Sequence, residues 1–204
     1  IHQSPEDMAE TVSQAFMGLS IGCAKCHNHP LEKWTNDQYY AFANLFSRVR
    51  AKGWGGDARS GDGKRTLVTV SSGELVQPKT GKPQLPTPLD AEPIAFDAPG
   101  DRREYAASWL TSPENDLFSR SITNRIWKKF FGVGLVEPVD QFTDYSKPHN
   151  PELMDRLEQV MKDLDYDMKS FLAMLYKSKA WQRQAHTEDI GPGAPFYFPG
   201  PAMS

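Results

Sequence analysis

Ile21-Gly22-Cys23-Ala24-Lys25-Cys26-His27-Asn28-His29-Pro30 is the stretch around which we expect the fold to be organised, and it holds both cysteines of the chain. Two residues separate the cysteines, and His27 follows directly. This Cys-x-x-Cys-His spacing is typical of c-type haem attachment, because two thiols so placed can add to the two vinyl groups of a porphyrin. The next residue then lies under the iron. We therefore expect covalent haem c on Cys23 and Cys26, with His27 as an axial metal ligand.

Three other interpretations of the cysteines stay open at this point. A redox disulfide normally belongs to a thioredoxin-like βαβ pattern, which the chain does not show. Zinc bound by both cysteines, His27 and His29 would need four ligands from within seven residues, which strains tetrahedral geometry. The third interpretation is that both thiols are buried and inert.

Composition limits the classes of protein that the chain can represent. Its 204 residues suffice for one large domain or two small ones, and 39% hydrophobic residues suit a globular core. The net charge of -3 gives no overall attraction to nucleic acid or to an anionic membrane. No membrane-spanning run is present, and two cysteines are too few for a disulfide framework.

The haem interpretation also predicts a compartment. Attachment of c-type haem takes place outside the cytoplasmic membrane, so we expect a periplasmic or otherwise exported protein. The chain begins at Ile1 without a signal peptide. We therefore expect that any targeting segment lay upstream or was removed.

Two amphipathic helices are predicted, one on each side of the cysteine motif. The first begins at Ser4, which can cap it, with Pro5 at its first position. The second begins at a capping box from Thr35 to Gln38. Each helix carries an apolar stripe, and the two stripes can form a haem wall or pack only against each other. The first stripe consists of Met8, Val12, Ala15, Phe16 and Leu19, and the second of Phe42, Leu45, Phe46 and Val49.

The region after the second helix is predicted to contain little helix. Residues 51–65 are rich in Gly and charged residues and are expected to form a loop. Residues 66–70 and 74–76 read as a β-hairpin around a turn at 71–73. Prolines recur from Pro78 to Pro99, which indicates an extended linker that wraps a surface or joins two subdomains.

Four further helices are predicted in the second half of the chain. They begin near Asp101, Asp116, Asn150 and Asp167, and Gly132 ends the second of them. The fold class is therefore mainly α: a helical bundle-like domain with one small β-hairpin and a Pro-rich linker. We expect two domains, a haem-motif subdomain over residues 1–98 and a helical companion subdomain over residues 99–204.

A six-coordinate haem would need a second axial ligand. We favour His149, which precedes a helix on a loop, over Met17, predicted to lie off the buried stripe, and Met8, predicted to lie on it. His2 and His29 are further candidates, and an empty position would permit small-molecule chemistry at iron. Arg125, on an otherwise apolar helix, is expected to bind a carboxylate such as a haem propionate or Glu137. The alternative to carboxylate binding is a structural role, in which Arg125 bridges two helices.

The chain also resembles the planctomycete-type cytochrome-like domain of unknown function, joined to its usual companion domain. Residues 18–29 and Asp37-x-Tyr39-Tyr40 carry the first part of the resemblance. The second rests on residues 107–113, 124–127, 130–136 and 151–153. The family often has an acid at the position of Asn28, and here the extra Asn150 shifts His149 by one position. The resemblance implies a fragment of a larger exported protein that often carries a separate cytochrome module.

The expected function is one-electron transfer to a redox partner protein or to an adjacent cytochrome module. One alternative is a haem- or metal-dependent redox enzyme that acts on an exported, polysaccharide-linked substrate. The other is a non-redox interaction module in which the Cys-x-x-Cys-His motif is structural.

Overall fold

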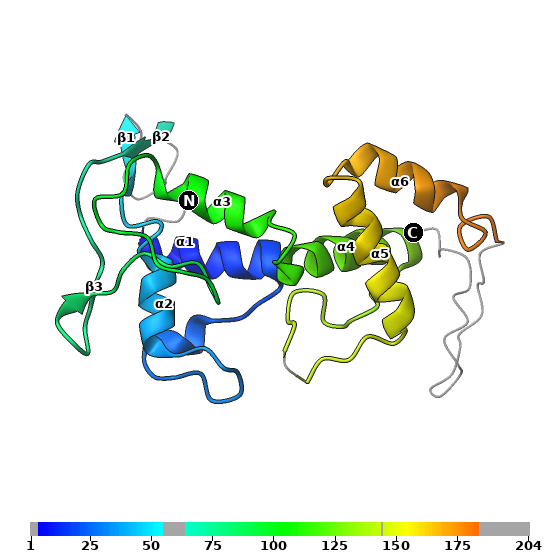
Figure 1. The fold of residues 1–204 in the computed structure, drawn as a ribbon, viewed down its shortest axis with the longest axis horizontal. Coiled ribbons are helices and arrows are strands. Elements are labelled where there is room, and N and C mark those ends of the chain that lie inside the picture. The colour runs from blue at the N-terminus through cyan, green and yellow to red at the C-terminus, as the bar shows by residue number, and fades with distance from the viewer. Residues whose placement is uncertain (1–3, 55–63, 144, 184–204) are drawn as a thin grey trace. The chain divides into compact units, whose positions relative to one another are not determined.

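The computed structural model describes residues 4–54, 64–143 and 145–183. The chain divides into two compact units (Figure 1), and the segment 14–20 belongs to the second. Unit 1 comprises Ile1–Ser13 and Ile21–Leu110, and unit 2 comprises Gln14–Ser20 and Thr111–Ser204. Helices dominate the described residues, beside two small antiparallel sheets, which confirms a mainly helical fold. The predicted domains, 1–98 and 99–204, stay a prediction.

The helical elements of unit 1 are α1 (Pro5–Val12), the 3₁₀ turn η2 (Gly22–Lys25), α2 (Asn36–Ala43) and α3 (Arg102–Leu110). Of these, α1 and α2 begin at the predicted caps, Ser4 and Thr35. The Ser4 Oγ accepts a hydrogen bond from the Asp7 N–H at 3.0 Å. In the capping box, the Thr35 N–H donates to the Gln38 Oε1 at 2.9 Å, and the Gln38 N–H donates to the Thr35 Oγ1 at 3.2 Å.

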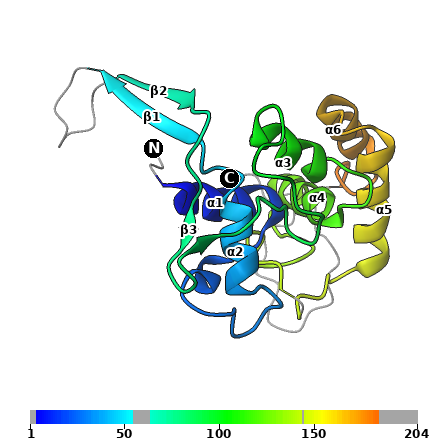
Figure 2. The same cartoon turned by 60° about the vertical axis from the view of Figure 1, so that its left-hand side comes forward.

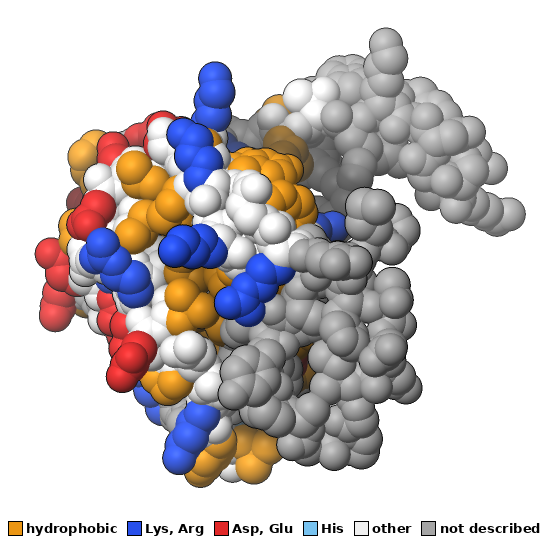
Figure 3. All heavy atoms as spheres, turned by 90° about the vertical axis from the view of Figure 1, so that its right-hand side faces the viewer, with side chains coloured by type: hydrophobic (Ala, Val, Ile, Leu, Met, Phe, Trp, Pro, Cys, Tyr) orange, Lys and Arg blue, Asp and Glu red, His pale blue; other side chains and the backbone are white. Residues whose placement is uncertain are grey.

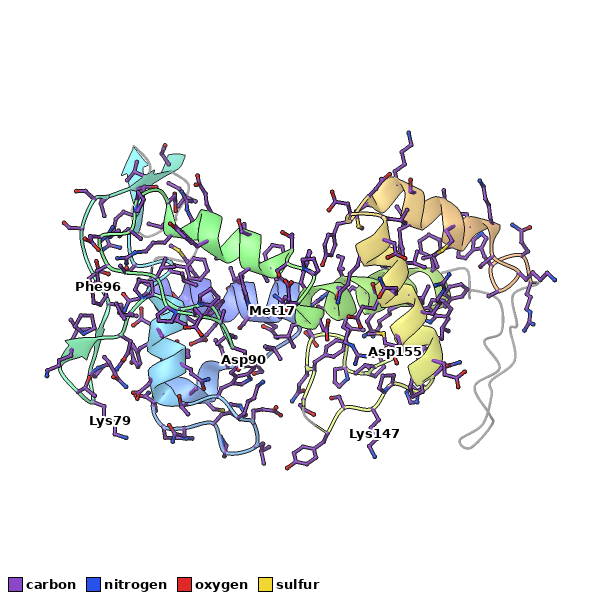
Figure 4. The ribbon with its side chains drawn as sticks, viewed as in Figure 1. Met17, Lys79, Asp90, Phe96, Lys147 and Asp155 are labelled. Atoms are coloured by element: carbon purple, nitrogen blue, oxygen red, sulfur yellow. The ribbon has the colours of Figure 1, made fainter. Side chains whose placement is uncertain are left out.

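A π-helical turn, η1 (Ser13–Met17), follows α1 and overturns the predicted stripe. Met17 was expected off the buried face, yet it is fully buried, whereas Phe16 is 46% exposed. A π-turn has more residues per turn than an α-helix. The side chains after Val12 are therefore rotated away from the positions that a 3.6-residue period predicts. Figure 4 labels Met17.

The predicted hairpin is wrong in its pairing. Strand β2 (Lys64–Thr69) pairs with β1 (Val49–Trp54) in antiparallel register, with Val49 opposite Thr69 (Figure 2). Part of the expected loop at 51–65 is therefore strand, and Val49 does not continue α2. A second, minimal sheet joins β3 (Val76–Gln77) to β4 (Lys82–Pro83).

Asn44 explains why residues 74–76 do not pair with β2. Its buried side chain accepts from the Leu75 N–H at 2.7 Å and donates to the Leu75 and Gln84 carbonyls. These bonds satisfy the backbone groups of Leu75 that a hairpin would have used. The Pro-rich segment wraps unit 1, because the Thr87 N–H donates to the Ala41 carbonyl and Leu89 is buried.

An ion pair between the buried Arg102 and the partly buried Glu74 fastens α3 to the rest of unit 1. The Arg102 guanidinium is 2.5 Å from the Glu74 carboxylate, and only 2% of its side chain is exposed. It also donates to the carbonyl of Phe96, a residue that Figure 4 labels, and lies over the Phe96 ring. Burial raises the pKa of Glu74, but hydrogen bonds from Arg102 and Arg48 outweigh that effect and hold the pKa below the usual 4.5.

We expect Arg102→Ala to lower the free energy of unfolding by about 3 kcal/mol, because the partly buried Glu74 carboxylate would keep only Arg48 as its ion-pair partner. Urea titration measures the change. Arg103→Ala, which removes the partly exposed pair with Asp101, should cost less than about 1 kcal/mol.

The effect of Arg102→Ala should also depend on pH. A carboxyl group whose pKa is lower in the folded state stabilises the folded state at a pH above its unfolded-state pKa. This contribution is lost as the pH falls through the folded-state pKa. The cost of Arg102→Ala should therefore shrink below pH 4.5; equal costs for both variants would contradict this account.

Unit 2 is built on α4 (Asp116–Phe131), α5 (Pro151–Asp163) and α6 (Met168–Lys177). Asn150 and Asp167 cap α5 and α6, and Gly132 ends α4 in the left-handed conformation, as predicted. The core consists of Ile126, Trp127, Phe130, Phe131, Leu135, Met154, Leu157, Met161, Phe171 and Leu175. None of the described helices is long and apolar enough to cross a bilayer.

Gly18 and Gly81 form a matched pair for testing the packing of the 14–20 segment. Both have φ of +67°, but a Cβ on Gly18 would lie 2.6 Å from the Phe142 ring, whereas a Cβ on Gly81 meets open space. We expect Gly81→Ala to cost only the strain of the left-handed conformation, about 1–2 kcal/mol. Gly18→Ala should cost clearly more in the same urea titration, and equal costs would show that the Phe142 ring yields freely.

Candidate functional site

A 3₁₀ turn presents both cysteines on one side of the cysteine motif. The Ala24 N–H donates to the Ile21 carbonyl at 2.9 Å, and the Cys26 N–H donates to the Cys23 carbonyl at 3.4 Å. Side chains three residues apart point the same way in a 3₁₀ turn. Ile21 and Ala24 are accordingly buried, while Cys23 and Cys26 are both exposed. The two thiols therefore share an accessible face.

The ring of His27 is exposed and held in one tautomer. Its Nδ1 lies 2.6 Å from the Asn28 carbonyl oxygen. Because a carbonyl oxygen only accepts, Nδ1 must carry the proton of this hydrogen bond. In a neutral ring the lone pair is then on Nε2, which is the arrangement of a metal-binding histidine whose other nitrogen is oriented by a carbonyl.

His29 is used differently. The ring Nδ1 accepts from the backbone N–H groups of Glu32 at 3.0 Å and Leu31 at 3.3 Å. The backbone N–H of His29 donates to the Trp34 carbonyl. With Nδ1 accepting, the proton of the neutral ring is on Nε2. His29 therefore closes the turn after the motif and presents no lone pair to a metal in this conformation.

Three amide side chains, which we call the amide clamp, tie the turn to its neighbours: the exposed Asn28 and the buried Asn36 and Gln77. The buried Asn36 donates through Nδ2 to the carbonyls of Ala24 at 2.7 Å and Lys25 at 2.9 Å. Its N–H donates to the Asn28 Oδ1 at 3.0 Å, and its Oδ1 accepts from the Gln77 Nε2 at 2.5 Å. The clamp thus joins the motif to α2 and β3.

A buried phenol lies next to the other end of the motif. The Tyr39 hydroxyl donates to the Glu10 Oε1 at 2.6 Å. Burial and this hydrogen bond raise the pKa of Tyr39 far above its usual 10, so the phenol stays a donor. The Glu10 carboxylate in turn lies 3.4 Å from the place of a Cβ on Gly22. Glu10 therefore links α1, α2 and the start of η2.

The remaining predicted site residues belong to unit 2. Arg125 donates through Nη2 to the Gln14 carbonyl at 2.7 Å and so connects α4 with η1. This contact corresponds to the structural alternative, in which Arg125 bridges two helices. Its expected partner Glu137 pairs instead with Lys128 at 3.0 Å. The His149 side chain is exposed, and its N–H donates to the Leu135 carbonyl. Its role as a metal ligand stays a prediction, as does propionate binding by Arg125; His2 lies outside the described residues.

The exposure of the two cysteines speaks against one competing interpretation, that both thiols are buried and inert. Cys23 and Cys26 are free thiols that are neither buried nor bonded to each other. Within residues 4–54, 64–143 and 145–183, no three His, Cys, Asp or Glu side chains converge as a metal-binding group. A covalent haem needs no such convergence, because the sulfurs bond to the porphyrin and only the imidazole meets iron.

Two family models match the chain. One, described as PSCyt2, a protein of unknown function (DUF1549), matches residues 1–51. The other, described as PSD1, a protein of unknown function (DUF1553), matches residues 102–191. No curated protein and no solved structure matches the chain. The two matches support the pairing of these two domains of unknown function in one chain.

The amide clamp predicts different outcomes at two asparagines. Asn36→Ala removes both bonds to the motif carbonyls and the acceptor of Gln77, and should cost about 3 kcal/mol of unfolding free energy. Asn28→Asp should stay within about 0.5 kcal/mol of wild type, because a carboxylate also accepts at the start of α2 and the helix dipole favours it. Chemical denaturation measures both. A large loss in Asn28→Asp, or none in Asn36→Ala, would contradict the clamp.

Proposed function

We propose that this chain is a c-type haem-binding protein that transfers one electron at a time in a periplasmic or otherwise exported compartment. The observation that carries the proposal is the 3₁₀ turn. It presents two free thiols on one exposed face, directly before an imidazole whose Nε2 bears the lone pair. The haem would supply a one-electron iron couple when bound.

The residues present fit this cofactor chemically. Each thiol adds across one porphyrin vinyl group: an S–C bond forms, the sulfhydryl hydrogen goes to the other vinyl carbon, and no oxidant is needed. Cys23 and Cys26 would provide the two thioethers, and His27 would bind iron through Nε2. Leu31, four residues after His27, is 70% exposed and offers apolar surface for a macrocycle to cover.

The surrounding residues would set the properties of the site. The Asn28 carbonyl accepts from the His27 Nδ1, and this bond would make the imidazole a stronger electron donor toward a bound iron and so favour the oxidised state. The amide clamp keeps the two carbonyls of the turn inside, so the thiols stay outside. Exposure of the motif also suits electron exchange with a redox partner protein or an adjacent cytochrome module.

A haem-dependent redox enzyme is the second candidate. The observation that favours it is the engagement of the His29 Nδ1 with two backbone N–H groups, which removes the nearest candidate for a second axial ligand. Binding of cyanide by the purified haem protein at low concentration would favour this candidate. Resistance to cyanide would favour a six-coordinate electron carrier.

The test is an absorption spectrum of protein exported by a host that matures c-type cytochromes. We expect a sharp reduced α-band that survives acid–acetone extraction. The double variant Cys23→Ala, Cys26→Ala should lose all covalent pigment, whereas Lys25→Ala, which keeps the spacing, should retain it. Wild-type protein without covalent pigment, or pigment kept by the double variant, would refute the attachment and leave a structural role for the motif.

A further inference from the structure

A second candidate binding site lies in unit 2, independent of the cysteine motif. It is a cavity of about 570 Å³ beside the C-terminal half of α4. This volume is within the range of sites for small molecules. The cavity lining includes the cations Arg125, Lys128 and Lys129 and the apolar residues Ile126, Phe130 and Leu172. Figure 3 shows a face of the molecule on which basic and hydrophobic side chains stand next to one another.

The charges at this cavity are positive and incompletely compensated. Its lining contains three cations and no carboxylate. Lys128 is neutralised by Glu137 at 3.0 Å. Within the described residues, Lys129 forms no ion pair, and Arg125 uses only its Nη2, on the neutral Gln14 carbonyl. Two uncompensated cations therefore line one cavity on a chain whose net charge is -3.

The helix end accounts for the charge of both lysines, whereas the one structural contact of Arg125, with the Gln14 carbonyl, does not neutralise its charge. Lys128 and Lys129 lie in the last turn of α4, where cations favourably meet the negative end of the helix dipole. Arg125 lies further from that end, and its Nε is buried without a hydrogen-bond partner among the described residues. A guanidinium that makes one hydrogen bond at the edge of an apolar cavity has unused donors for a planar anion.

The rest of the lining is apolar. Ile126 and Phe130 are buried residues of the core cluster, and Leu172 packs against that cluster. Free inorganic anions would gain nothing from these side chains, and a neutral apolar molecule would gain nothing from the cations. The combination selects a ligand with both properties.

We propose that this cavity binds a small organic carboxylate that carries an aromatic or branched apolar group. The carboxylate would lie between Arg125 and Lys129, and the apolar group would cover Ile126, Phe130 and Leu172. Binding of this kind does not depend on haem attachment in unit 1.

Titration calorimetry of the full chain with 2-naphthoate tests the proposal. The neutral 2-naphthamide has nearly the same shape, and acetate has the charge alone. We expect 2-naphthoate to bind about tenfold or more tightly than either control, which corresponds to about 1.4 kcal/mol or more for the combined contacts. Equal affinities for 2-naphthoate and 2-naphthamide, or no binding of 2-naphthoate, would overturn the proposal.

Variants locate the binding. Lys129→Gln should weaken 2-naphthoate about fivefold or more, as expected for a lost charge-assisted contact, without affecting 2-naphthamide. Lys129 is exposed, so the variant should keep its fold. Arg125→Gln should weaken binding further, with its circular dichroism spectrum checked because it also loses the Gln14 contact. Lys169→Gln, an exposed control outside the lining, should change the affinity less than twofold. Equal effects of Lys129→Gln and Lys169→Gln would overturn the site.

Discussion

The two hydrogen bonds from the Asn36 carboxamide to the carbonyls of Ala24 and Lys25 are the contacts on which the cysteine motif depends. A 3₁₀ turn leaves carbonyls that its own backbone does not satisfy, and unpaired carbonyls in a buried position are costly. Asn36 pairs both from the inner side. The turn can therefore bury Ile21 and Ala24 while both thiols face outward. Presentation of the thiols is thus a consequence of packing on the opposite side of the turn.

Local signals in the sequence predicted the local structure well. Ser4, Thr35 with Gln38, Asn150 and Asp167 cap helices where their short-range chemistry indicates, because each cap acts within three residues. The Cys-x-x-Cys-His motif is a local signal of the same kind, because its residues are adjacent in the sequence. The π-turn at η1 was missed because a periodic pattern assumes 3.6 residues per turn, and a single wider turn shifts every later side chain.

Long-range pairings could not be predicted in the same way. Gln77 meets Asn36 across 41 positions, at the edge of a segment that read as the start of a linker. Asn44 meets Leu75 across 31 positions and redirects the strand that was expected to close a hairpin. Nothing in the type or spacing of these residues distinguishes them from exposed polar residues. Asn124 in unit 2 is a further example of such a pairing. Its buried side chain pairs with both backbone groups of Val136, whereas the adjacent Arg125 lines the cavity.

The central claim is that Cys23 and Cys26 carry a porphyrin. The most direct measurement is the mass of the proteolytic peptide containing residues 21–30, isolated from natively exported protein under denaturing, non-reducing conditions. Our account predicts a peptide heavier by the mass of one haem, with neither thiol available to an alkylating reagent. A peptide of unmodified mass with two reactive thiols, or one lighter by two hydrogens through a disulfide, would contradict it.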